Sequence, residues 1–321
     1  LSDMYDFRLK VFQRVAWNLS FTKAAQELQI SQPAVTKHIR ELESIYNTRL
    51  FDRVGNKIAL TAAGIILLKH CDTILSEYSK LNYKMHQLNN KEVGQIHIGA
   101  SLTIAQYILP AFLAQFCQEY PDISLDLQMH NTLEIENMLH AQKIDIGLIE
   151  GPSRKPYLKY SPFLKDEIVA IVRNTARWGD SPFPLSKIKE LPLILREHTS
   201  GTTQFIEENL QKYGIKYSSL NVLMHMGSTE GIKSFLRHSD CVGLLSIYSV
   251  SKELMNGEFR IIDFQDFTIE REFCFVQNQG DNSEINQLFI NFINKKSSEQ
   301  NGQKSGQCMT SNPAPNTYDV D

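Results

Sequence analysis

Residues 20–43 read SFTKAAQELQISQPAVTKHIRELE, and this stretch decides the fold of the N-terminal part of the chain. Ser20 can cap a short helix, and Ser31 can cap a second helix that carries Pro33 in its first turn. A short turn between helices with small inner residues lets them cross closely. Apolar residues recur at helical spacing as Ala24, Ala25 and Leu28 in the first helix and as Val35, Ile39 and Leu42 in the second.

The polar face of the second helix is the one that suggests a function. Gln32, Thr36 and Arg40 are four residues apart and line up on one side, with Pro33 and Lys37 in the adjacent row. An element that enters a major groove needs hydrogen-bonding tips for base edges and cations for phosphates. A solvated helix face can show the same stripe, so the chain on either side of the helix decides between the two interpretations.

The segment after this helix predicts a basic β-hairpin. Gly55-Asn56 between apolar residues is typical of a hairpin turn, and Arg53 and Lys57 flank it. A basic hairpin directly after such a helix is a wing. A further helix is expected ahead, from Leu9, Phe12, Val15 and Ala16. Residues 1–61 are therefore predicted to form an all-α winged helix-turn-helix that binds double-stranded DNA.

The same residues carry a family resemblance. The run from Ser20 to Thr36, then LFDR at 50–53 and LTAAG at 60–64, resembles without a gap the DNA-binding signature of LysR-type transcription regulators. One departure is Val54, where no second arginine follows Arg53, which implies a lighter hold of the wing on phosphates. The resemblance implies DNA contacts by Ser31, Gln32, Pro33, Thr36, Lys37 and Arg40 in the groove and by Arg53 and Lys57 on the backbone.

Residues 62–90 predict one long helix, capped by Thr61. Two sets of core positions alternate over three heptads, which favours pairing with the same helix of a second subunit. Packing of the helix on its own chain is the alternative. The resemblance to LysR-type regulators implies a linker helix that dimerises, and commonly a homotetramer. The heptad residues are Leu67, Ile74, Leu81 and Leu88, with Cys71, Tyr78 and Met85 between them.

Residues 91–300 predict an α/β effector-binding domain. Strand patterns alternate with helical patterns in two similar series, which predicts parallel sheets in two Rossmann-like subdomains with a cleft between them, as in periplasmic binding proteins. Subdomain I is expected to comprise 91–163 and 268–300, and subdomain II 164–267. The expected strands are 95–100, 123–129, 145–150, 167–173, 192–196, 220–226, 241–246 and 270–277, and the expected helices are 103–120, 132–142, 202–213, 229–238 and 284–296.

Four strand-to-helix turns carry hydroxyl or amide side chains where α/β proteins bind ligands. Each such residue is also an ordinary helix cap. The LysR resemblance extends over this region and implies that an effector is bound by Ser101, Thr103, Asn131, Ser200, Thr202 and Thr229. Residues 146–151 and 199–202 resemble the branch that regulates sulfur or carbon assimilation, but Thr203 stands where that branch often has an arginine, which opposes a strongly anionic ligand such as sulfate.

Composition and charge distribution indicate a globular, DNA-binding protein rather than a membrane protein. The 321 residues are 42% hydrophobic and 21% charged, and no apolar run is long enough to span a membrane. Residues 1–60 carry nine Lys/Arg against six Asp/Glu, a formal charge of +3. Because the whole chain has a formal charge of −3, the rest of it carries −6. A basic head on an acidic body suits DNA binding. Residues 301–321 are polar without periodicity and predict a disordered tail.

Catalytic, metal and cofactor sites are not predicted. The five cysteines are far apart and in no CxxC pattern, which argues for a reducing compartment and against a zinc site. No Cys lies between Cys117 and Cys241, which excludes the peroxide-sensing branch with its cysteine pair. No GxGxxG, GxSxG, HExxH or P-loop run occurs.

The sequence thus predicts a cytoplasmic, effector-responsive transcription regulator that binds a palindrome-like site as a dimer of dimers. One alternative is a solute-binding protein of periplasmic-binding-protein fold without a regulatory role, which the 60-residue head and the lack of an apolar leader pattern in residues 1–8 oppose. A second is a catabolic enzyme on an α/β scaffold, for which no nucleophile–base pair is found.

Overall fold

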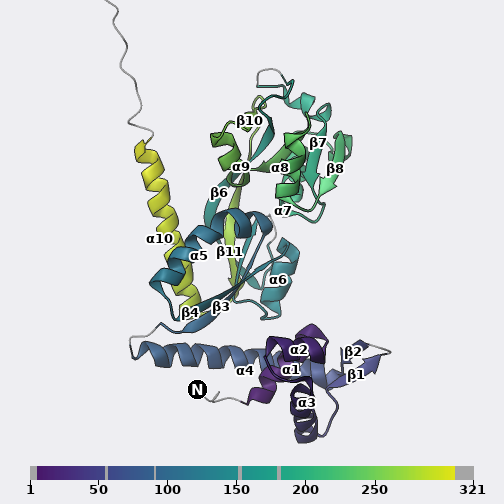
Figure 1. Cartoon of the computed structure of the whole chain (residues 1–321), viewed down its shortest axis with the longest axis vertical. Coiled ribbons are helices and arrows are strands. Elements are labelled where there is room, and N and C mark those ends of the chain that lie inside the picture. The colour runs from purple at the N-terminus through teal and green to yellow at the C-terminus, as the bar shows by residue number, and fades with distance from the viewer. Residues whose placement is uncertain (1–5, 55–56, 90–91, 151–153, 179–181, 308–321) are drawn as a thin grey trace, which may run out of the picture. The chain divides into compact units, whose positions relative to one another are not determined.

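The computed structural model describes residues 6–54, 57–89, 92–150, 154–178 and 182–307; for Val54, Lys57 and residues 300–307 it describes the backbone alone. The chain divides into two compact units, residues 1–94 and 95–321. We call the first the head and the second the body, and each is described by itself (Figure 1).

The head is a three-helix unit followed by a hairpin and a long helix. Each helix begins where a polar side chain accepts a hydrogen bond from a first-turn amide, which satisfies one of the free N–H groups of the helix start. Ser20, Ser31 and Thr61 cap α2, α3 and α4 as predicted. The elements are α1 (Phe7–Asn18), α2 (Phe21–Glu27), α3 (Gln32–Tyr46), β1 (Phe51–Val54), β2 (Lys57–Leu60) and α4 (Ala62–Gln87).

The core of the head joins all these elements. Phe12 is fully buried, and its ring centroid lies 5.4 Å from that of Phe51 at the start of the hairpin. The predicted inner faces of α2 and α3 are confirmed, since Ala24, Val35 and Ile39 are buried in the same cluster. Hydrophobic burial on the inner side of α3 therefore leaves its opposite side free.

The heptad pattern of α4 divides between two environments. Leu67 and Cys71 pack into the head core, and Cys71 is 0% exposed. Ile74 and Leu81 are each 48% exposed, and Leu88 is 77% exposed. The prediction of one continuous seam for a partner helix is wrong for the N-terminal part of α4, because the head itself needs that face to close its core.

The body contains a nine-stranded sheet with helices on it. The strands follow the order β4-β3-β5-β11-β6-β9-β7-β8, with β10 paired to β6. They are β3 (Gly94–Ala100), β4 (Ile123–Met129), β5 (Ile146–Glu150), β6 (Leu158–Arg173), β7 (Leu193–Arg196), β8 (Val222–Met226), β9 (Val242–Ser246), β10 (Phe259–Ile262) and β11 (Ile269–Asn278). The helices are η1 (Ile104–Ile108), α5 (Leu109–Glu119), α6 (Thr132–His140), η2 (Leu185–Lys189), α7 (Gly201–Lys212), η3 (Tyr217–Ser219), α8 (Thr229–Arg237), α9 (Ile247–Met255) and α10 (Glu284–Gln307).

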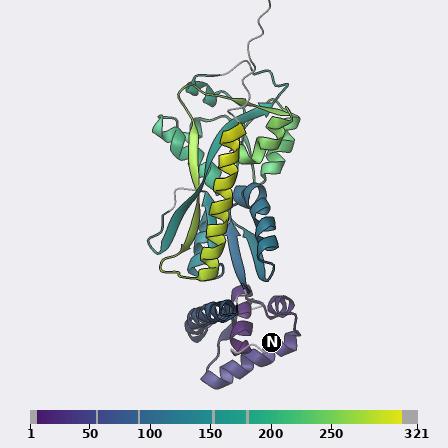
Figure 2. The same ribbon diagram turned by 90° about the vertical axis from the view of Figure 1, so that its left-hand side faces the viewer.

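Two lobes are joined by two long antiparallel strands. β3 pairs parallel with β5 in one lobe, and β7 pairs parallel with β8 and β9 in the other. β6 and β11 run antiparallel to each other and extend from one lobe into the other (Figures 1 and 2). Separate hydrophobic clusters fill the lobes. The predicted class, a helical winged head with a two-lobed α/β body, is confirmed.

Several details of the body differ from the expectation. β6 begins at Leu158, nine residues before the predicted strand start at 167, because its first half pairs with β11. The sheet is mixed rather than parallel, since β6 pairs antiparallel with β9, β10 and β11. α9 and β10 were not predicted. The helix expected over 103–120 starts as the π-helix η1 before it continues as α5.

The C-terminal helix is longer than predicted. α10 continues to Gln307, so residues 301–307, expected to be disordered, are helical, while the rest of the predicted tail lies outside the described residues. Phe289 and Phe292 of α10 each place a ring centroid 5.2 Å from that of Phe116 on α5. Of the helices described, none combines the length and the apolar character that a membrane crossing requires.

Candidate DNA interface and effector site

The outer side of α3 carries the predicted polar ridge, formed by Ser31, Gln32, Pro33, Thr36, Lys37 and Arg40. Lys37 has 77% of its side chain exposed, and its Nζ lies 4.0 Å from Glu41. Gln32 Nε2 donates to Thr36 Oγ1 at 3.0 Å. Thr36 is half-buried, and the other five ridge residues are exposed. The predicted ridge is thus brought together on one surface, with both of its cations, Lys37 and Arg40, exposed.

One hydrogen bond ties the base of the hairpin to α3, and a second joins the two ends of the hairpin segment. Glu43 Oε1 accepts from the Leu50 N–H at 2.8 Å, and Thr61 Oγ1 donates to the Arg49 carbonyl at 2.7 Å. Arg53 is exposed on β1, while the Lys57 side chain and the turn 55–56 lie outside the described residues. Glu43 therefore fixes the start of the hairpin relative to α3.

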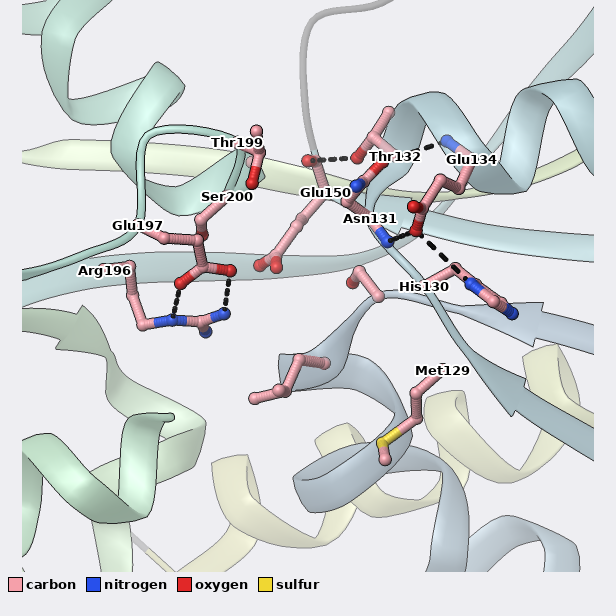
Figure 3. A pocket seen from close by; sticks show the side chains of 13 residues that line it. Met129, His130, Asn131, Thr132, Glu134, Glu150, Arg196, Glu197, Thr199 and Ser200 are labelled. Carbon is pink, nitrogen blue, oxygen red and sulfur yellow. Dashed lines mark hydrogen bonds and ion pairs between the residues drawn. The ribbon is translucent and has the colours of Figure 1, made fainter. Parts of the chain in front are cut away.

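A polar cleft of about 250 Å³ opens in the body where several strands end (Figure 3). It lies at the ends of β3, β4, β5 and β7 and at the N-termini of α6 and α7, the position at which α/β sheets bind ligands. Its lining residues are Ser101, Leu102, Met129, His130, Asn131, Thr132, Glu134, Glu150, Arg196, Glu197, Thr199, Ser200 and Gly201.

Three of the six predicted effector residues line this cleft. Ser101, Asn131 and Ser200 do so, and the last two also cap α6 and α7. Asn131 and Ser200 thus serve as helix caps and also line the cleft. Ser101 Oγ is different, because it is buried and has no hydrogen-bond partner among the described residues.

The other three predicted residues do not line the cleft but contact side chains that do. Thr103 Oγ1 donates to Glu150 Oε1 at 3.3 Å, and Thr202 Oγ1 lies 3.5 Å from Glu150 Oε2. Thr229 Oγ1 accepts from Arg196 Nη1 at 3.2 Å. Thr103, Thr202 and Thr229 are each at most 3% exposed. They orient charged lining residues rather than line the cleft themselves.

A buried ionic network that the sequence reasoning missed supports Glu150. Arg271 Nη2 lies 2.7 Å from Glu150 Oε2 as an ion pair that is not aligned as a hydrogen bond, and Arg271 Nε donates to Asp166 Oδ2 at 2.6 Å. Ser246 Oγ donates to Asp166 Oδ1 at 2.6 Å. Burial raises the pKa of Asp166, while Arg271 and Ser246 favour its charged form. Asp166 and Arg271 each stand in the middle of three consecutive charged residues, at 165–167 and 270–272, so the local sequence did not single them out.

Arg196 and Glu197 form a second charged pair, at the cleft itself. Arg196 Nε and Nη2 each donate to one carboxylate oxygen of Glu197 at 2.8 Å. The Arg196 side chain is buried, with only 4% of its surface exposed. His198 lies in a separate pocket, where its ring centroid is 4.2 Å from that of His225.

Within the residues that the structure describes, no three His, Cys, Asp or Glu side chains are grouped to hold a metal ion. Cys71, Cys241 and Cys274 are buried and free, and Cys117 is exposed. Burial raises the pKa of the Cys71 thiol to about 12, which keeps it protonated and unreactive.

An exposed cationic helix beside a wing, together with a two-lobed body that encloses a polar cleft, defines a DNA-binding regulator that responds to a small molecule. The family model for the bacterial regulatory helix-turn-helix protein, lysR family, matches residues 7–65, and the model for the LysR substrate binding domain matches residues 89–298. The chain belongs to the LysR family of transcription regulators.

Curated relatives cover most of the chain. It is 30% identical over 292 residues to the HTH-type transcriptional regulator CysL of Bacillus subtilis (strain 168), covering 90% of this chain and 97% of CysL. It is 33% identical over 280 residues to a "Probable RuBisCO transcriptional regulator" of Cyanidioschyzon merolae, covering 84% and 91%. Because such relatives are transcription regulators, the alternative of a solute-binding protein without a regulatory role is wrong.

Solved structures of similar fold include full-length regulators. CbnR in complex with its target DNA superposes with a TM-score of 0.62 at 18% identity, covering 91% of this chain and 99% of that one. The regulatory domain of Synechocystis PCC6803 CcmR in complex with 2-PG has a TM-score of 0.57 at 25% identity, covering 62% and 95%.

Proposed function

We propose that this regulator acts in the cytoplasm, without catalytic activity, and senses a small polar or anionic metabolite in the cleft of its body. The observation that supports this most directly is Ser101 Oγ, a buried hydroxyl without a partner among the described residues, at a cleft onto which two helix N-termini open. The relative named as a probable RuBisCO transcriptional regulator supports assignment to the carbon-assimilation side of the branch that regulates sulfur or carbon assimilation.

The effector-binding residues are proposed to act in two layers. Ser101, Asn131 and Ser200 face the ligand, and Thr103, Thr202 and Thr229 hold Glu150 and Arg196 in position. The CcmR regulatory domain in complex with 2-PG supports the idea that this type of domain takes a small molecule. The proposed units are a DNA-binding domain of residues 1–61, a linker helix of 62–90, subdomain I of 91–163 with 268–300, and subdomain II of 164–267.

The test of the cleft separates ligand response from DNA binding. Ser101→Ala and Thr202→Ala are expected to abolish effector induction of a reporter while gel shifts with the upstream DNA stay unchanged, since both residues lie in the body. Ser251→Ala, an exposed hydroxyl on α9, is the matched control. Induction that survives both cleft substitutions would show that the effector binds elsewhere.

DNA binding is proposed to use the polar ridge of α3 in the major groove and the wing on the phosphates. The exposed Lys37, Arg40 and Arg53 supply the cations. A partner subunit is proposed to supply the second head, because one small head covers little DNA. The exposed apolar side chains of the C-terminal half of α4, Ile74, Leu81, Met85 and Leu88, are the surface that such a partner would cover as homodimer or homotetramer.

A further inference from the structure

We propose that Glu197 occupies the position on Arg196 that an oxyanion group of the effector takes on binding. The effector would thus be a small anion, with a carboxylate as the best match, and Glu197 would be an internal competitor that sets its affinity. This inference rests on the proposed function, because it assigns a ligand class and a mode of regulation to the same cleft.

The geometry of the Arg196–Glu197 pair is that of a bound carboxylate. Two guanidinium nitrogens donate to the two oxygens at 2.8 Å each, the parallel arrangement that guanidinium groups make with planar carboxylates. The third nitrogen, Nη1, is fixed by Thr229 Oγ1 at 3.2 Å. The guanidinium is thus held with its paired edge toward Glu197, and any replacement anion would meet it in that orientation.

The two partners differ in how firmly they are buried. The Arg196 side chain is 4% exposed and the Glu197 side chain 36%. A guanidinium does not lose its proton in a protein, so a buried one needs an anion beside it in every state of the cleft. Glu197 can move into water at low cost, whereas Arg196 cannot, which makes the carboxylate the exchangeable member of the pair.

The other charged groups of the cleft are already engaged. Glu150 is paired with Arg271, which is 0% exposed, and Glu134 completes the capping box of α6. Arg196 is the one Lys or Arg among the described residues that line the cleft. An anion entering the cleft therefore has Arg196 as its natural cation, and Glu197 stands in the way.

Further donors line the same cleft. Ser101 Oγ is buried at the cleft and lacks a partner among the described residues, which costs stability unless a ligand or water satisfies it. α6 and α7 also begin at the cleft, and the positive ends of their dipoles favour negative charge. The volume of about 250 Å³ limits the ligand to a small metabolite.

The test measures the affinity of simple anions for the full-length protein. Acetate, inorganic phosphate and sulfate would be titrated calorimetrically at constant ionic strength, so that planar and tetrahedral oxyanions are compared. Glu197→Gln is expected to bind at least one of them roughly tenfold more tightly than wild type, because the competing carboxylate is gone. Glu208→Gln, which removes the same charge at an exposed position of α7, is expected to match wild type.

A double variant checks that Arg196 is the binding partner. Glu197→Gln combined with Arg196→Gln removes both charges, so no unpaired ion stays buried, and it is expected to lose the gained affinity. Circular dichroism would confirm that each variant is folded. Among the three probes, the one with the largest gain identifies the head group.

Three outcomes would overturn the inference: equal anion affinity in Glu197→Gln and wild type, no anion binding by Glu197→Gln, or a gain that persists in the double variant. Failure here is distinct from failure of the proposed cleft. If Ser101→Ala and Thr202→Ala abolish induction while Glu197→Gln leaves anion affinity unchanged, the cleft stands and the role of Glu197 falls.

Discussion

Lys37 and Arg40 show how much of the DNA-binding function depends on individual exposed side chains. Both lie on the outer side of α3, opposite the buried Val35 and Ile39, so removing either leaves the head core intact. Their contribution to stability is small, because the nearest acidic group to Lys37 Nζ is Glu41 at 4.0 Å. Changes at these positions should therefore report on DNA contacts rather than on folding.

We expect Lys37→Ala and Arg40→Ala to weaken operator binding. Loss of one phosphate contact at Lys37 should lower the slope of log K against log salt by about one. Gel shifts or fluorescence anisotropy over a salt series would measure this. Lys252→Ala, at an exposed position of α9, removes the same charge and should leave binding unchanged. Unchanged affinity and slope in both ridge variants would contradict the assignment of the ridge.

Gly201 is a second position where a single residue decides the local structure, because there is no room for a Cβ atom. An added Cβ would lie 2.2 Å from the Glu150 carbonyl oxygen, so the N-terminus of α7 can approach β5 this closely only with glycine. We expect Gly201→Ala to destabilise the body by about 1–3 kcal/mol through overpacking and to reduce effector response.

Urea unfolding of the Gly201→Ala variant would measure its stability, and a reporter would measure induction. Gly227→Ala is the matched control, since a Cβ there meets nothing within 4 Å. Equal stability of Gly201→Ala and wild type would mean that the strand end and the helix start are less tightly packed than described.

The elements η1 and α8 meet through a charged cluster that links the two lobes. Tyr107 Oη donates to Glu230 Oε1 at 2.6 Å, and Lys233 Nζ lies 2.7 Å from both Glu230 and Glu253. Burial would raise the pKa of Glu230, but the hydrogen bonds from Lys233 and Tyr107 outweigh it, so the pKa lies below its ordinary value.

This lowered pKa predicts a pH dependence of stability. A carboxyl group with a lowered pKa in the folded state stabilises the protein above its ordinary pKa of 4.5, and this contribution is lost as the pH falls through the folded-state value. We therefore expect the stability difference between wild type and Glu230→Gln to be largest at neutral pH and to shrink below pH 4.5.

Urea unfolding over a pH series would measure the difference. Glu119→Gln, exposed at the end of α5, serves as the control for removal of one carboxylate. A constant difference between wild type and Glu230→Gln at every pH would show that the cluster does not depend on the charge of Glu230.

At the scale of the whole molecule, α4 serves two purposes in succession. Its first half closes the head core through Cys71, and its second half leaves Leu81 and Leu88 exposed. An exposed apolar stripe on a long helix is unfavourable in water unless a partner covers it. If a second subunit covers this stripe, it brings a second head to the DNA, so paired DNA binding would depend on the second half of α4.

We expect Leu81→Lys to dissociate the oligomer and to weaken DNA binding, because two linked heads bind with an advantage that one head lacks. Analytical ultracentrifugation and gel shifts would measure the two effects. Ser79→Lys, exposed on the same helix, introduces the same charge outside the apolar stripe. An unchanged mass for Leu81→Lys would mean that α4 is not the main interface.

Prediction from sequence succeeded where the signal was local. The caps Ser20, Ser31 and Thr61 and the inner faces of α2 and α3 depend on residues a few positions apart. Predictions were less accurate where partners are distant in the chain. The Arg271–Asp166 pair, which was not predicted, spans 105 residues. Three of the six predicted effector residues do not line the cleft but contact the lining residues Glu150 and Arg196 from behind.

The amino-acid sequence by itself determined the winged helical head, the alternating α/β body, the family and the ridge of α3, because helix periodicity, caps and turn residues act within short segments. Only the tertiary structure decided that Leu67 and Cys71 serve the head core, that Glu150 is held by Arg271, and that Arg196 is buried against Glu197. These contacts depend on which strand ends and faces the fold brings together, and no local pattern specifies that.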